Sequence, residues 1–137
     1  YKGFDLSLYF RGAFGFDIFN IHEFYYGVPD EVGNVMKIAY TKNEQIKGNP
    51  VVCDYFLEKG DYVKLDMVNF GYTFDINRKY IQKARLYLTG RNLLTFTKFS
   101  GVDPASYNVN GLTPGATGSR NWYPATRQMI FGVQIDF

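Results

Sequence analysis

The sequence predicts an all-β fold, an antiparallel transmembrane β-barrel of which this chain supplies the last four strands and two long extracellular loops. Segments of about ten residues alternate between apolar and polar side chains, which is the period of a strand and the length that a tilted strand needs to cross a bilayer. Aromatic residues make up 19% of the 137 residues, and they favour strands and form girdles at membrane interfaces. No apolar run is long enough for a transmembrane helix.

The segment 128–137 shows the alternation most clearly. One face of the predicted strand carries Met129, Phe131, Val133, Ile135 and Phe137, and the other carries Gln128, Gly132, Gln134 and Asp136, with Ile130 as an apolar intruder. This pattern predicts a strand with one apolar and one polar side. The last strand of a soluble β-sandwich alternates in the same way, so this segment alone leaves both folds open.

The first predicted strand, 4–14, is followed by a long connection over residues 15–61. Within it, residues 19–26 predict one or two helical turns capped by Asn20, and residues 35–40 predict another short element. A structureless loop of this length is improbable inside a compact soluble domain and is typical of the outer side of a barrel.

The second and third predicted strands, 62–74 and 84–96, are joined by the short polar connection 75–83. The apolar residues of 62–74 change parity between Met67 and Val68, which indicates either a β-bulge or a change from loop contacts to lipid. Gly90 interrupts the apolar face of the third strand and indicates a bend. The polar face there carries Arg85 and Arg91, which fits a hydrated lumen and equally the solvated side of a sandwich.

A second long loop, 98–125, precedes the last strand. If the C-terminus lies in the periplasm, both long loops fall on the cell exterior, as in outer-membrane barrels. Four strands cannot close a barrel, so we expect completion by the rest of a longer chain or by further copies, as in a trimeric anchor. The chain begins at Tyr1 without a signal peptide, so we expect a piece of a longer or processed protein.

Composition and motifs exclude several classes of function. The net charge of +2 comes without a basic cluster, so we expect no nucleic acid partner. Cys53 cannot form an internal disulfide, and His22 is the only histidine. Because no nucleophile–base pair, zinc motif or phosphate-binding loop is present, we predict no enzyme activity, no metal and no cofactor.

The second long loop holds the candidate binding residues. Tyr107, Trp122 and Tyr123 lie among Asn108, Asn110, Arg120 and Asn121, and such rings and amides are those with which proteins hold sugars. The alternative is that the rings pack the loop against the barrel rim.

Several motifs resemble SusC/RagA-type TonB-dependent transporters of Bacteroidetes. They are VKLDMVNFGYTF at 63–74, ARLYLTGRNLLTFTKF at 84–99, GVDP at 101–104 and GFDIFN at 15–20, with Pro124 and Arg127 before the final strand. Arg91 replaces the Gln that usually precedes Asn92, and Ala105 replaces the acidic residue that usually follows Asp103 and Pro104.

The resemblance implies a 22-stranded barrel with an internal plug, in the bacterial outer membrane, of which residues 1–137 are the C-terminal portion. It implies import of glycans, oligosaccharides or peptides, energised by the TonB complex through an upstream segment and capped by a SusD-like surface lipoprotein. That lipoprotein is a further surface against which the loop rings could pack. Phe137 resembles the signal by which the barrel-assembly machinery selects its clients.

Overall fold

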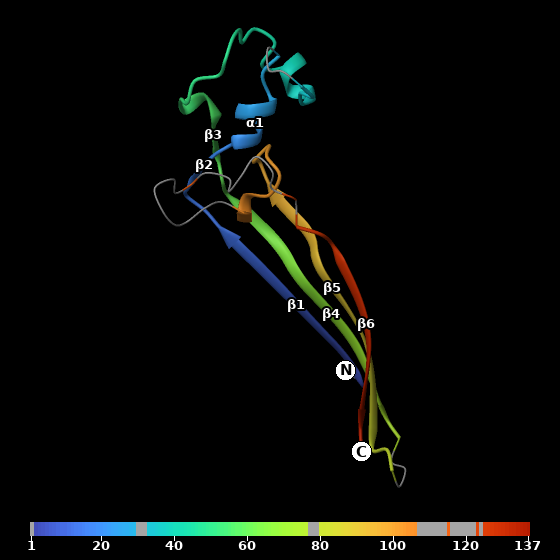
Figure 1. Ribbon diagram of the computed structural model, residues 1–137. Helices are drawn as coiled ribbons and strands as arrows, with labels where there is room; N and C mark the ends of the chain where they lie inside the picture. The colour runs from blue at the N-terminus through green and yellow to red at the C-terminus, as the bar shows by residue number, and fades with distance from the viewer. Residues whose placement is uncertain (1, 30–32, 77–79, 107–114, 116–122, 124) are drawn as a thin grey trace. The chain divides into compact units, whose positions relative to one another are not determined.

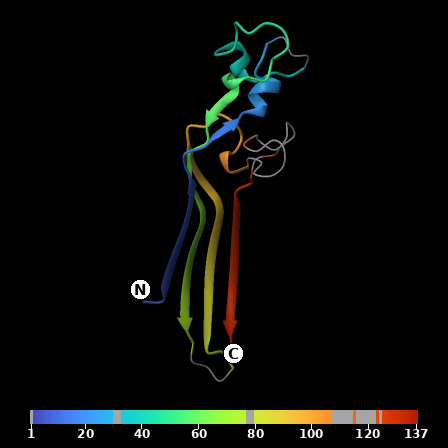
Figure 2. The ribbon, with the colours of Figure 1, turned by 90° about the vertical axis from the view of Figure 1, so that its left-hand side faces the viewer.

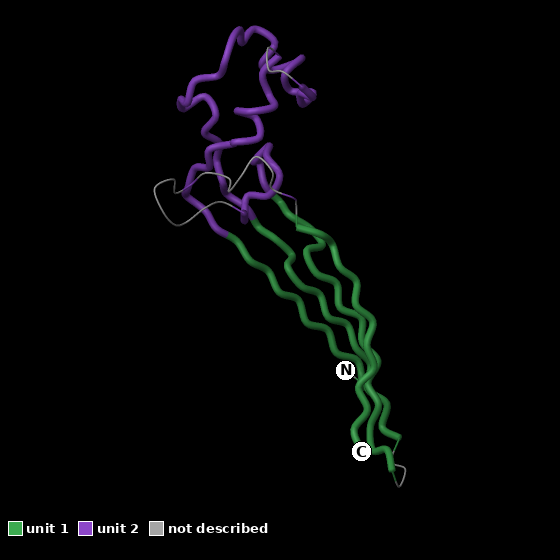
Figure 3. Tube along the Cα trace, in the orientation of Figure 1, with its two compact units in different colours: residues 1–12, 63–96, 125–137 green, residues 13–62, 97–124 purple. Residues whose placement is uncertain are grey.

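The computed structural model describes residues 2–29, 33–76, 80–106, 115, 123 and 125–137. These residues form mainly antiparallel β-sheet with little helix, which confirms the predicted all-β, antiparallel class. The chain divides into two compact units (Figure 3). The first unit is Tyr1–Gly12, Val63–Phe96 and Ala125–Phe137, and the second unit is Ala13–Tyr62 and Thr97–Pro124.

The first unit is built on one sheet. Its strands are β1 (Phe4–Ala13), β4 (Tyr62–Asp75), β5 (Lys83–Thr97) and β6 (Gln128–Asp136), in the order β1-β4-β5-β6. They run side by side in two perpendicular views (Figures 1 and 2), with β1 and β6 as the outer strands of the described sheet. The four strands overlap the four ranges that alternation predicts. The sheet is open, so it does not by itself form a barrel.

One face of this sheet is apolar and exposed. Its exposed side chains include Leu6, Leu8, Phe10, Phe70, Leu86, Leu88, Met129, Phe131, Val133 and Ile135. Across β5 and β6, Leu86 lies opposite Val133 and Leu88 lies opposite Phe131, so the apolar residues of neighbouring strands share a face. An exposed apolar surface of this extent marks a face that meets another apolar phase or partner.

Contacts on the opposite, polar face locate an irregularity in β4. The Arg85 guanidinium donates to Asp5 Oδ1 at 3.0 Å, and this pair lies over Gly71, where an added Cβ would come within 2.6 Å of both side chains. Arg11 Nε lies 3.2 Å from Asp66 Oδ2. Because Asp5 and Arg11 share parity in β1, Asp66 and Gly71 face the same side although their positions differ by five, an odd number. Regular alternation forbids this, so β4 contains an extra residue between them, in agreement with the bulge reading of the parity change at Met67 and Val68.

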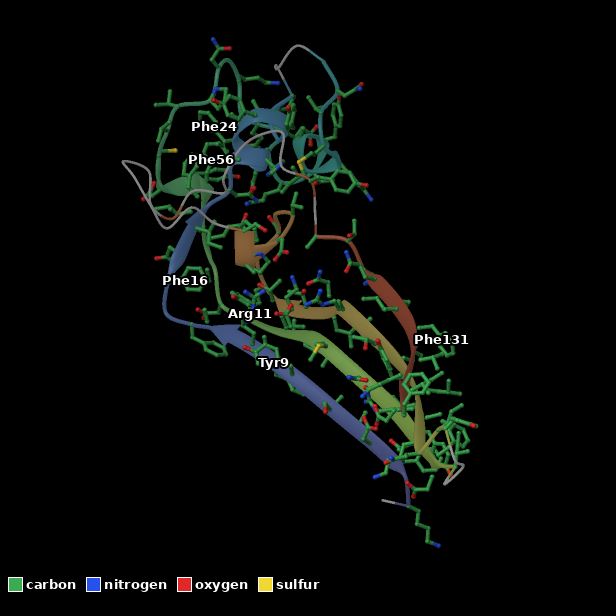
Figure 4. The ribbon with its side chains drawn as sticks, turned by 60° about the horizontal axis from the view of Figure 1, so that its bottom comes forward. Tyr9, Arg11, Phe16, Phe24, Phe56 and Phe131 are labelled. Atoms are coloured by element: carbon green, nitrogen blue, oxygen red, sulfur yellow. The ribbon has the colours of Figure 1, made fainter. Side chains whose placement is uncertain are left out.

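The second unit contains the short elements. A two-stranded antiparallel sheet joins β2 (Asp17–Phe19) to β3 (Leu57–Lys59). The helices are α1 (Ile21–Tyr26), η1 (Lys37–Tyr40), η2 (Asp54–Phe56) and η3 (Pro104–Ser106). Ile18, Val28, Ala39 and Phe56 are buried. The rings of Phe24 and Phe56 meet edge to face at 5.2 Å and lie beside one another in Figure 4, so this unit has an apolar centre of its own.

The structure adds one feature to the predicted connection 15–61 and bears out another. The added feature is the pairing of β2 with β3, for which the sequence pattern gave no signal. The predicted helical turn is present as α1, and Asn20 Oδ1 accepts the Glu23 N–H at 3.1 Å as its N-cap. In the described part of the chain, no helix is long and apolar enough to cross a membrane.

Candidate functional site

The polar face of the four-stranded sheet carries a concave site, here called the polar-face site. It is lined by Tyr9 and Arg11 of β1, Asp66 and Met67 of β4, Arg91 and Asn92 of β5, and Gln128 of β6. Its volume is about 590 Å³, which lies within the range of small-molecule sites. Tyr9 and Arg11 are labelled in Figure 4. All of its residues belong to the first unit, so the sheet alone positions them.

Two departures from regular strand geometry shape this site. Consecutive residues of a strand point to opposite faces, yet Arg91 and Asn92 both line the site, as do Asp66 and Met67. Asn92 has a φ of 54°, a left-handed conformation that asparagine tolerates better than most residues. Its Nδ2 donates to the Thr126 carbonyl oxygen at 3.1 Å. The Asn92 irregularity therefore adds a side chain to the wall of the site beside Arg91.

The polar-face site carries more positive than negative charge. Arg11 pairs with Asp66 through an Nε–Oδ2 distance of 3.2 Å, with side-chain exposures of 45% and 23%. Arg91 makes no hydrogen bond or ion pair with any residue that the structure describes. Two arginines and one aspartate leave one net positive charge. The site can therefore accept an anionic group, which a guanidinium binds through two parallel hydrogen bonds.

The second unit contains a separate network of hydrogen bonds around Glu58. Asn20 Nδ2 donates to Glu58 Oε1 at 2.8 Å and to Ser100 Oγ at 3.1 Å. The Ser100 N–H donates to Glu58 Oε2 at 2.7 Å. Burial alone would raise the pKa of Glu58, but the hydrogen bonds from Asn20 and Ser100 hold that pKa below its ordinary value. These bonds tie the start of α1 to β3 and to residue 100.

A second group of hydrogen bonds in this unit involves the Glu23 carboxylate. This side chain is 1% exposed, and its Oε1 accepts from Lys42 Nζ and Asn43 Nδ2, both at 3.0 Å. Burial alone would lower the pKa of Lys42, but the hydrogen bond to Glu23 raises it overall. Asn43 also donates to the Gly27 carbonyl oxygen at 2.9 Å and accepts from the Tyr55 hydroxyl at 2.6 Å. This arrangement fixes α1 against residues 42–55, and we interpret it as structural.

Of the three candidate binding residues of the second loop, Tyr123 alone lies among the residues that the structure describes. Tyr107 and Trp122 lie outside the described residues, and the side chain of Tyr123 is 79% exposed. Phe137 is 84% exposed, and Cys53 is an exposed free thiol. Among the described ranges, no three His, Cys, Asp or Glu side chains are grouped as metal ligands would be. The roles predicted for Tyr107, Trp122, Tyr123 and Phe137 stay predictions.

Sequence reasoning missed the polar-face site. Alternation does place Tyr9, Arg11, Arg91 and Gln128 on polar faces, and that signal was available. The register between strands decides which of these residues meet. Arg91 lies opposite Gln128 because the β5–β6 ladder starts from the pair Lys83 and Asp136, eight residues earlier in β5. Register between strands distant in sequence is not a local property.

No family model matches the chain. The chain is 29% identical over 159 residues to TonB-dependent receptor P3 of Formosa agariphila and 27% identical over 157 residues to TonB-dependent receptor P26 of the same organism. Both alignments cover 100% of this chain, which spans only 15% and 16% of the length of these relatives.

Solved structures show the same fold. The chain superposes on part of the RagAB peptide transporter with a TM-score of 0.78, and on the RagAB peptide importer in its closed-closed state with a TM-score of 0.72. Identity is 22% in both cases, and the match covers 100% of this chain and 16% of the other. The resemblance to SusC/RagA-type TonB-dependent outer-membrane transporters that the motifs predict is thus confirmed, because the whole of this chain is similar to a segment of such receptors.

Proposed function

We propose that residues 1–137 are the C-terminal portion of the β-barrel domain of an outer-membrane active transporter. The observation that carries this proposal is the two-faced sheet, with exposed apolar side chains on one face and a charged concave site on the other. Barrels that cross the outer membrane place their apolar residues toward lipid and their polar residues toward the lumen. The open edges of β1 and β6 then pair with further strands of the same protein.

The proposed transporter imports glycans, oligosaccharides or peptides. Similarity to two proteins named TonB-dependent receptors supports energisation by the TonB complex, through a segment upstream of this chain. The SusC/RagA-type motifs support a SusD-like lipoprotein as the lid, and the fold shared with a peptide importer supports passage of substrates of that size. In this proposal the four-stranded sheet forms part of the barrel wall, and no enzyme role is proposed for its residues.

The first test is the intact mass and location of the native polypeptide that carries this sequence, purified from its source cells. A product several times larger than 15.8 kDa, recovered from the outer membrane, is the expected result. A membrane-bound product of 15.8 kDa would replace the proposal with a self-assembling barrel anchor. A soluble product would replace it with a β-sandwich binding module.

The loop rings are proposed as ligand contacts on the extracellular side. Tyr107, Trp122 and Tyr123 provide flat apolar faces beside amide groups, a combination that suits sugar rings. Trp122→Ala and Tyr123→Ala are expected to reduce substrate binding and uptake in a protein that still inserts at normal levels. Unchanged binding and uptake in both variants would assign the rings to contacts with the barrel rim or the lid.

Phe137 is proposed as part of the signal read by the barrel-assembly machinery. Its ring is exposed at the end of β6, where an external factor can reach it during assembly. Deleting Phe137 is expected to lower the amount of inserted protein without changing the substrate affinity of the molecules that do insert. Normal outer-membrane levels of the deletion variant would refute this role.

A further inference from the structure

The polar-face site contains one guanidinium, that of Arg91, which has no partner among the described residues. Arg11 is held by Asp66 at 3.2 Å, whereas Arg91, on the next strand but one, has no hydrogen-bond or ion-pair partner in the part of the chain that the structure describes. Neutral donors and acceptors surround these charges, namely the Tyr9 hydroxyl and the amides of Asn92 and Gln128. A cation placed among hydrogen-bonding groups in a concavity is the arrangement of an anion-binding site.

We propose that the polar-face site binds a carboxylate group, held by Arg91 through two parallel hydrogen bonds and flanked by the amide of Gln128. The register supports this pairing, because Gln128 is the residue directly opposite Arg91 in the β5–β6 ladder. The left-handed backbone of Asn92 adds a second amide beside Arg91. A planar guanidinium fork matches the geometry of a carboxylate.

The charges of the polar-face site favour a carboxylate over other ligands. Asp66 lies in the same site, and its negative charge would repel a doubly charged phosphate more strongly than a singly charged carboxylate. A neutral sugar would leave the charge of Arg91 unbalanced. One negative charge neutralises the site, since two arginines and one aspartate sum to a single positive charge.

Two sources could supply this carboxylate, and the proposal deepens the proposed function because it takes the polar face as the lumen wall. The first source is a transported substrate, such as the C-terminal carboxylate of a peptide or an acidic sugar. The second source is an acidic side chain from another part of the same polypeptide. The chemistry at Arg91 is the same in both cases, so the experiment has to separate the sources.

The experiment uses the purified full-length protein that contains this chain, in detergent. The probes are N-acetylated tetra-alanine with a free C-terminal carboxylate and the same peptide with a C-terminal amide, compared by titration calorimetry. The test variant is Arg91→Gln. The matched control is Lys83→Gln, which removes one positive charge from the same strand at a position of equal parity outside the site. Labelling of arginines by phenylglyoxal, with exposed Arg127 as the internal reference, is measured on the same samples without added peptide.

If a substrate supplies the carboxylate, the acid peptide binds wild type about tenfold more tightly than the amide, the usual scale of one charge-assisted interaction. Arg91→Gln then abolishes the preference, and Lys83→Gln keeps it. If the protein itself supplies it, neither peptide is preferred, Arg91 is labelled far more slowly than Arg127, and Arg91→Gln lowers the Tm more than Lys83→Gln does.

Equal peptide affinities together with labelling of Arg91 as fast as that of Arg127 would overturn the proposal. Both readouts use purified protein, so they are independent of uptake. Failure of the proposed function would instead appear as a short or soluble native product, which the intact mass and cell fractionation detect.

Discussion

At the scale of single residues, Asn92 shows how one backbone conformation builds part of a site. Its φ of 54° interrupts the alternation of β5 and brings two consecutive side chains, those of Arg91 and Asn92, to the same concavity. Most residues resist this conformation, because their Cβ comes too close to the following carbonyl oxygen. Asparagine supplies both the tolerance and the donor to Thr126.

We predict that Asn92→Ala destabilises the protein more than Asn92→Gly does. Both variants lose the hydrogen bond to the Thr126 carbonyl oxygen, but only alanine adds the strain of a left-handed backbone, which costs about 1 kcal/mol or more. Urea unfolding of the purified protein in detergent measures the difference. Equal urea midpoints for the two variants would show that position 92 carries no strain from a left-handed backbone.

The charge state of Glu58 affects the stability of the second unit. Hydrogen bonds from Asn20 and Ser100 lower its pKa against the opposing effect of burial, so the folded carboxylate binds its proton less readily than the unfolded one. The stabilisation is present above the unfolded pKa, about 4.3, and is lost as the pH falls through the lower folded pKa.

We therefore predict that Glu58→Gln speeds hydrogen exchange of the α1 amides at neutral pH, and that this effect shrinks progressively as the pH falls below about 4. A loss of about 1 kcal/mol, discounted for the partial exposure of Glu58, corresponds to roughly fivefold faster exchange. Glu44→Gln, at an exposed position of the same unit, is the control and should leave exchange unchanged. A difference between Glu58→Gln and wild type that persists undiminished at pH 3.5, about one unit below the unfolded pKa, would disprove the assignment.

At the scale of elements, the long strands could be predicted because their signal is local. Alternation over ten or more residues locates β1, β4, β5 and β6 without knowledge of their partners. The three-residue strands β2 and β3 carry no such signal. They exist because Ile18 pairs with Glu58, forty residues away, and because a buried centre at Ile18 and Phe56 supports that pairing.

The candidate site could likewise be predicted only in part from the sequence. Membership of the polar face is local, so Arg91 could be placed there from the sequence alone. The neighbours of Arg91 on other strands could not, since they depend on register and on two breaks in alternation. The parity change at Met67 and Val68 gave a local signal for one break, whereas Asn92 gave none beyond the tolerance of asparagine for left-handed backbone.

The pairing of β5 with β6 allows a prediction about packing between these two strands. Gly132 lies opposite Tyr87, and an added Cβ at Gly132 would clash with the Tyr87 ring, which itself lies under the Arg85 guanidinium at 5.2 Å. We predict that Gly132→Ala destabilises the protein by about 1–3 kcal/mol. In a Tyr87→Ala background the same substitution should cost much less, and the double-mutant cycle by urea unfolding measures this coupling. Additive effects would show that the ring does not occupy this space.

At the scale of the whole molecule, the four-stranded sheet has two features that a stable fold must cover. Its apolar face is open, and its outer strands β1 and β6 have edges without partners among the described residues. Covering the face with a second sheet would give a sandwich, while pairing the edges with more strands and immersing the face in lipid would give a barrel. Substitutions at two consecutive residues of β6 distinguish the sandwich from the barrel, because consecutive side chains point to opposite faces of the sheet.

Phe131 and Ile130 form the matched pair for this test, since they lie at the same depth of β6 on opposite faces and are both apolar. Phe131 is 69% exposed on the apolar face, and Ile130 is 41% exposed on the polar face. In a barrel, Phe131→Arg places a charge in hydrocarbon and costs about 2–4 kcal/mol near the midplane, whereas lumen substitutions do not carry this cost. We therefore predict that Phe131→Arg sharply reduces the heat-modifiable, folded fraction of full-length protein in lipid vesicles, while Ile130→Arg leaves most of it folded. Similar losses in both variants, or tolerance of both, would exclude lipid as the environment of the apolar face.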